Sequence, residues 1–209
     1  MNKKRFIWLV PVLLMAFAIS ACKSDDDDGG TRETLSWSGK QVYNTDGTLY
    51  TGGNAAFVSS AGGSGTINGG KMSFSISTPN SQKSMTTLLV ELDVRYGHNV
   101  FSYAGYDPAN TQAMDLAFTN LRKKINKTTA ASITKEEIYY IYVDRDCIVT
   151  ATGIPSITTD GDIPVKVPNY TLKLKKGWNP VGMILAANTT SGTLIIGTGD
   201  SDSCEWVFE

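Results

Sequence analysis

The stretch 65-GTINGGKMSFSIS-77 decides the fold class of this chain. In its second half Met72, Phe74 and Ile76 alternate with serines, the pattern of a strand with one face on a core and the other in water. The segment Asn68-Gly69-Gly70 before it accepts the positive φ of a tight turn. The stretch therefore predicts a β-hairpin within an antiparallel meander.

The same period of two continues on both sides of this hairpin. A second hairpin is predicted around Asp46-Gly47, between strands at Lys40–Asn44 and Thr48–Thr51. Further strands are predicted at Thr87–Arg95, Val100–Tyr103, Ile138–Val143, Cys147–Ala151, Val165–Lys175, Val181–Ala186, Thr193–Ile196 and Cys204–Phe208. Their number and spacing indicate a mostly β fold, an antiparallel sandwich or barrel. Residues 35–209 are enough for one sizeable core, and no linker divides them, so we expect a single mostly β domain.

One segment departs from the period of two. Asp107-Pro108 is a typical helix start, and Ala113, Leu116 and Leu121 follow at helical spacing. We therefore expect one helical insertion around residues 108–127, which would cover a sheet edge or an open barrel end.

The first 21 residues predict a lipoprotein signal peptide. The basic residues Lys3, Lys4 and Arg5 precede the apolar segment Phe6–Ala18. At about 1.5 Å per residue this segment is too short to cross roughly 30 Å of hydrocarbon. The sequence Ile-Ser-Ala-Cys22 then resembles the bacterial lipobox, which implies covalent diacylglycerol on Cys22 and a lipidated acidic tether over residues 22–34.

The tether adds an indication of where the protein is displayed. Lys23-Ser-Asp-Asp-Asp-Asp28 resembles the acidic export signal of surface-exposed lipoproteins of Bacteroidetes-type bacteria. This resemblance implies an outer-membrane, cell-surface location, with the membrane as a partner through the lipid anchor. The alternative is that the aspartates and the glycines after them form only a solvated, self-repelling linker.

Charge and motifs narrow the function classes. Without residues 1–21 the chain has 16 basic and 20 acidic residues, a formal charge of −4, and four of the acids lie in the tether. A nearly neutral body lacks the basic face that nucleic-acid binding requires. The sequence also contains no Gly-x-Ser-x-Gly elbow, phosphate-binding loop, His-Glu-x-x-His motif or dinucleotide fingerprint.

Two cysteines remain when Cys22 is assigned to lipid. Cys147 and Cys204 form a candidate disulfide, because an extracytoplasmic compartment is oxidising. The alternative is that both are buried small apolar residues.

The motif Asp-x-Asp occurs three times near predicted strand ends. Its members are candidate calcium ligands, or the carboxylate pair of a hydrolase, because hard cations and glycoside cleavage both use converging carboxylates. The alternative is that they are turn residues in water. They are Asp144 and Asp146, Asp160 and Asp162, and Asp200 and Asp202.

Aromatic residues supply the last candidate site. Tyr140 and Tyr142 share one face of a predicted strand, and Trp178 follows another. Exposed on a sheet, such rings would stack on sugar rings. The alternative is packing in the core.

Taken together, these features lead us to expect a lipid-anchored surface protein that is a non-catalytic binding module for glycan or peptide. Alternatives are a structural, adhesin- or fimbria-like envelope component and a hydrolase that uses the Asp pairs.

Overall fold

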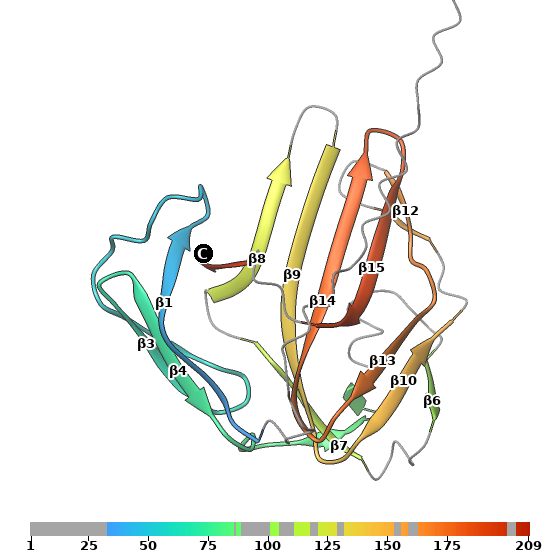
Figure 1. The fold of residues 1–209 in the computed structure, drawn as a ribbon, viewed down its shortest axis with the longest axis horizontal. Helices are drawn as coiled ribbons and strands as arrows, with labels where there is room; N and C mark the ends of the chain where they lie inside the picture. Colours follow the sequence, from blue (N-terminus) through green and yellow to red (C-terminus); the bar gives the residue numbers. More distant parts are fainter. Residues whose placement is uncertain are drawn as a thin grey trace, which may run out of the picture.

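The computed structural model describes residues 33–85, 87–88, 101–104, 111–117, 121–128, 132–152, 156–158, 163–199 and 204–209, and strands dominate this part of the chain (Figure 1). The predicted signal peptide, Cys22 and the acidic run lie outside it. The strands are β1 (Leu35–Asn44), β2 (Ala55–Val58), β3 (Ser64–Asn68), β4 (Lys71–Ile76), β5 (Lys83–Ser84), β6 (Phe101–Ala104), β7 (Gln112–Leu116), β8 (Leu121–Thr128), β9 (Ser132–Val143), β10 (Cys147–Ala151), β11 (Ile157–Thr158), β12 (Pro164–Lys166), β13 (Tyr170–Leu174), β14 (Gly177–Asn188), β15 (Gly192–Thr198) and β16 (Glu205–Phe208). None of the helical residues described belongs to a helix long and apolar enough to span a bilayer.

Most strands belong to one large sheet. Its order is β11-β12-β15-β14-β9-β8-β16-β1-β4-β3-β2, with β7 also pairing with β9 and β5 with β7. The sheet is mixed, because β1 pairs with β16 in parallel and β12 pairs with β15 in parallel. The expectation of a mostly β chain is confirmed, whereas the expectation of a purely antiparallel one is wrong. As far as the described strands show, the sheet remains open between β2 and β11 and forms no closed barrel.

The hairpin that decided the fold class is confirmed. β3 and β4 pair antiparallel, and Gly69 and Gly70 turn the chain with φ of 56° and 74°. The second predicted hairpin forms only in part: Gly47 turns with φ of 82°, but the arm after it contributes a single bridge, between Tyr43 and Leu49.

The prediction of a helical insertion around residues 108–127 is wrong. Residues 112–116 form β7 and residues 121–128 form β8, and both pair with the same edge of β9, through Leu116 opposite Tyr140 and Lys123 opposite Ile138. The physical reason is burial on two sides, because Met114 and Leu116 contact one core cluster and Ala113 the other. A strand with apolar residues on both faces loses the strict alternation of a half-buried strand, and apolar spacing alone does not distinguish it from a buried helix.

The predicted strand Thr87–Arg95 is also not seen where the chain can be followed. Thr87 and Leu88 are helical, and the rest of that range lies outside the described residues. The predicted strand Val165–Lys175 is divided into β12 and β13 around Pro168, which has no N–H to donate to a ladder.

Two cores lie on opposite faces of β9 and β14. The N-terminal strands β1 to β4 pack on one face, burying Phe74 against Tyr140 and Trp178 in one cluster. The three-stranded sheet β13-β10-β6 lies on the other side, where Ile141 and Val143 join a second cluster with Val149. Figure 1 shows this layering, with β1, β3 and β4 to one side of β9 and β14 and with β10 and β13 to the other.

Candidate functional site

The predicted aromatic site is part of the core. Tyr140, Tyr142 and Trp178 are 2%, 7% and 1% exposed. The ring of Trp37 lies edge-on to Tyr140 with 4.9 Å between centroids, and Tyr142 lies edge-on to Trp178 at 5.4 Å. Trp178 Nε1 also donates to the carbonyl of Ser77 at 2.6 Å. These rings therefore hold the N-terminal strands against β9 and β14 and present no face to a sugar, so the predicted exposure is wrong.

Other aromatic side chains do not replace them. Among the aromatic residues whose burial the structure describes, every one is buried or half-buried. No described aromatic ring is therefore fully exposed.

Asp144 and Asp146 occupy the turn between β9 and β10, where both are hydrogen-bonded. Asp144 accepts a bidentate pair from Arg145, at 2.8 and 3.0 Å, and a bond from the Gln112 backbone N–H at 3.0 Å. Asp146 accepts from Lys175 Nζ at 2.8 Å and from the Lys176 backbone N–H at 2.9 Å. The side-chain bond from Arg145 lowers the pKa of Asp144, and that from Lys175 lowers the pKa of Asp146. Both carboxylates therefore fasten this turn to its neighbours.

No group of three or more metal-ligating side chains occurs within the described ranges. Asp160, Asp162, Asp200 and Asp202 lie outside them. A calcium site or a hydrolytic carboxylate pair that involves these four residues stays a prediction.

The two cysteines lie in different parts of the interior. Cys204 belongs to the cluster shared with the N-terminal strands, and Cys147 belongs to the cluster under the three-stranded sheet. Both are buried, and no disulfide joins them in this structure. The arrangement supports the alternative in which each is packed as a small apolar side chain.

The outward face of the N-terminal strands carries a second kind of site. Small side chains with exposed hydroxyl groups lie on three adjacent strands, and we call this surface the hydroxyl face. It consists of Ser36 and Ser38 of β1, Ser73 and Ser75 of β4, and Ser64 and Thr66 of β3. Ser36 lies opposite Ser75, and Ser73 lies between Ser38 on one side and Thr66 on the other. The alternation that buries Met72, Phe74 and Ile76 is what places these hydroxyls together in water.

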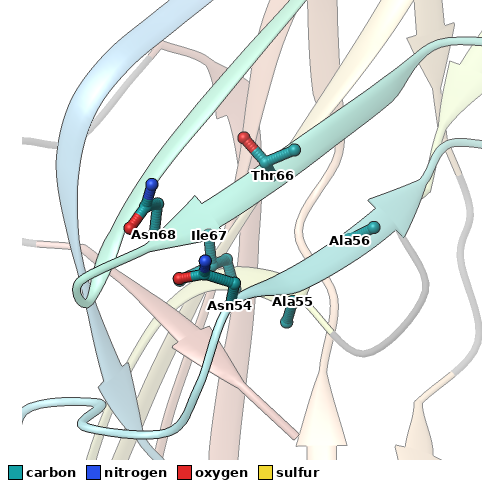
Figure 2. A pocket seen from close by; sticks show the side chains of 6 residues that line it. All are labelled: Asn54, Ala55, Ala56, Thr66, Ile67 and Asn68. Atoms are coloured by element: carbon teal, nitrogen blue, oxygen red, sulfur yellow. The ribbon is translucent and has the colours of Figure 1, made fainter.

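A shallow hollow of about 300 Å³ continues the hydroxyl face toward β2. Asn54, Thr66 and Asn68 supply its polar lining, and Ala55, Ala56 and Ile67 the rest. Figure 2 shows Asn54 and Asn68 at the end of the hollow near the β3–β4 turn, with Thr66 farther along β3. Ala56 lies opposite Thr66, and its short side chain leaves the space open.

The polar side chains of this surface are available for binding. Within the described part of the chain, no side-chain hydrogen bond engages the six hydroxyl residues or the two asparagines. All eight are exposed and uncharged, and no carboxylate, histidine or cysteine lies among them. The surface can therefore donate and accept hydrogen bonds, but it offers no acid–base pair.

The sequence contains a signal for this surface. The serines of residues 73–77 indicate the solvent-facing side of one strand, and other strands carry the same alternation. A search for hydroxyl residues at alternate positions on several neighbouring strands would have found it, because Ser36-Trp-Ser38 and Ser64-Gly-Thr66 repeat the pattern.

Comparison with protein-family models, with curated proteins and with solved structures finds no match to this chain. The chemistry of the hydroxyl face and of the adjoining hollow is therefore the basis for inferring a function.

Proposed function

We propose that this chain is a lipid-anchored outer-membrane surface protein and that its folded domain is a non-catalytic binding module for glycan or peptide. The observation that supports this most directly is the set of eight exposed, uncharged polar side chains whose hydrogen-bonding groups are directed to solvent. Desolvating such groups is costly unless a ligand replaces the lost water, so a surface of this kind selects ligands with matching donors and acceptors.

The position of the chain entry agrees with display on a tether. Glu33 Oε1 lies 3.9 Å from Lys176 Nζ, beside the start of β14. Ser77, just after β4, contacts Trp178 in the same region. The hollow lies at the opposite end of β4, which at about 3.3 Å per residue is roughly 20 Å away. A module anchored through Cys22 would thus hold the hollow away from its attachment point.

The first Asp-x-Asp pair, Asp144 and Asp146, supports a binding role better than a hydrolytic one. Asp144 and Asp146 are held in ion pairs and by backbone N–H groups. Both have a lowered pKa. A general acid in glycoside cleavage needs a raised pKa, so neither carboxyl group suits that role.

The test of this proposal uses the full-length chain in cells. We expect Cys22 to incorporate labelled palmitate, Cys22→Ala to abolish the label, and a protease added to intact cells to remove the domain. We also expect the purified lipoprotein to retain members of a panel of polysaccharides and peptides without cleaving them. Absence of lipid, protection from the protease, retention of no ligand or turnover of a ligand would each contradict the proposal.

A second function, assembly into an envelope structure, is favoured by one observation. β2 ends the described sheet, and Val58 on it is 57% exposed. An exposed edge strand with an apolar side chain can pair with another chain. If the edge is used, Val58→Lys would abolish oligomers in cross-linking of intact cells. If the wild-type protein forms no oligomers in this assay, the alternative is wrong.

A further inference from the structure

We infer that the ligand of the hydroxyl face is a neutral polysaccharide, bound as an extended chain across β1, β4 and β3 and held at one end in the hollow of Figure 2. The inference rests on the proposed function and names the ligand class of the same site. It depends on three features of the surface: its charge, its regular spacing and the amide groups at its end.

Charge favours a neutral ligand. The sequence has no charged residue between Asp46 and Lys71, so β2, β3 and the loops around them are uncharged. Lys71, opposite Asn68, is the one charged residue paired directly with the polar set on β3. An ionic ligand would therefore lose hydration with little compensation, whereas sugar hydroxyls would exchange water for groups of their own kind.

Spacing favours a repeating polymer. Neighbouring strands lie about 4.8 Å apart, and alternate residues along a strand are about 6.8 Å apart. Ser38, Ser73 and Thr66 lie in one row across three strands, and Ser36 and Ser75 begin the next row. A polymer with hydroxyls at every unit can meet such rows repeatedly, whereas a peptide has side chains that differ at each step.

The hollow supplies direction. Asn54 and Asn68 line it with amide groups, each of which donates and accepts, and Ala56 keeps it open. Thr66 belongs both to the hollow and to the row that contains Ser73. Of all the residues in the site, Thr66 is therefore the one whose loss should weaken binding most.

The energy of each contact is small, so the length of the ligand matters. A neutral hydrogen bond contributes only modestly to binding, because each partner gives up a hydrogen bond to water. Several rows engaged together act as linked sites, which raise the overall affinity well above that of one row. We therefore expect long chains to bind and short oligosaccharides of the same sugar to bind at least about tenfold more weakly.

The experiment is affinity electrophoresis of the full-length lipoprotein in detergent, with soluble neutral polysaccharides, an anionic polysaccharide and extended peptides as probes. We expect retardation by at least one neutral polysaccharide. We also expect Thr66→Val to weaken it about tenfold, while Thr134→Val, a matched change on an exposed position of β9, leaves it unchanged. Valine fits a strand as well as threonine does, so both variants should fold, and circular dichroism checks this.

The other outcomes contradict the neutral-polysaccharide inference, the assigned surface or the proposed function itself. Binding of peptides alone, weakened by Thr66→Val, would overturn the neutral-polysaccharide inference and leave the binding module standing. Binding of the anionic polymer alone, lost in about 0.5 M salt and in Lys71→Ala, would do the same. Polysaccharide binding that Thr66→Val and Ser73→Val leave intact would overturn the assigned surface. No binding to any probe would count against both proposals.

Discussion

β4 and the second half of β9 contribute to one core, yet they differ in what they leave for function. β4 alternates strictly, with Met72, Phe74 and Ile76 inside and serines outside. β9 from Tyr140 to Val143 is buried on both faces, because a sheet packs on each side of it. The large aromatic residues that suggested a binding site are thus packed in the core, and the surface that we propose for binding consists of small residues on strands with one exposed face.

The largest effect should come from the doubly covered layer. Trp178→Ala removes a side chain that is 1% exposed and leaves the Ser77 carbonyl without its donor. We expect a loss of about 3–5 kcal/mol in the free energy of unfolding, measured by urea denaturation. A loss below about 1 kcal/mol would mean that this layer is not tightly packed.

Gly65 tests how sharply β3 separates its two faces. A Cβ at this position would overlap the Phe57 ring and lie 2.8 Å from the Ser73 carbonyl oxygen. We expect Gly65→Val to cost about 1–3 kcal/mol in thermal or urea unfolding through overpacking. Thr66→Val, one residue away on the outer face, should change stability by less than about 0.5 kcal/mol. Equal effects of the two substitutions would contradict the alternation.

The turn carboxylates should give a small, pH-dependent effect. The pKa values of Asp144 and Asp146 are lowered in the folded chain, so their contribution is present above the ordinary carboxyl pKa. It is lost as pH falls through the folded pKa values, which lie below 3.8.

Asp146→Asn isolates one of these two carboxylates. We expect this substitution to lower stability at pH 7 by at most about 1 kcal/mol, since Asp146 is 48% exposed, and to have a smaller effect as the pH falls below 3.8. Urea midpoints of the wild type and the variant at pH 7 and at a series of acidic pH values measure this. A difference that stays constant over the whole series would show that the carboxylate charge is not the cause.

The smallest effect on stability should come from the hydroxyl face. Ser73→Ala removes an exposed hydroxyl that makes no hydrogen bond to another described side chain. We expect a change within about 0.5 kcal/mol in unfolding, with a reduction of ligand retention in the electrophoretic assay. A large loss of stability would mean that Ser73 supports the sheet, and the comparison with β9 would then fail.

The contrast between half-buried strands such as β4 and strands covered on both faces such as β9 also explains which elements could be predicted from the sequence. The β3–β4 hairpin was predictable, because Asn68-Gly69-Gly70 specifies the turn and Met72, Phe74 and Ile76 specify the buried face. β7 and β8 were not, because the apolar residues Ala113, Leu116 and Leu121 also fit a helical spacing, and pairing with the edge of β9 is what makes both segments strands. The parallel pairing of β1 with β16 joins residues more than 160 positions apart, and no local pattern encodes it.

The candidate site was predictable only in its parts. Each serine is ordinary by itself, and its meaning depends on the register that sets Ser73 between Ser38 and Thr66. Tyr140, Tyr142 and Trp178 were conspicuous in the sequence, but their burial depends on layers contributed by distant segments.

The position of β1 between β4 and β16 has a mechanical consequence. The chain enters at the start of β1, which pairs with β4 through Leu35–Gln41 and with β16 through Val42–Asn44. Ladder hydrogen bonds lie across the strand axis, so a pull on the residues before β1 loads both ladders in shear. The strand can leave only if many bonds break together. The end of the chain that would bear the load of a captured polymer is thus the end that resists extraction by force.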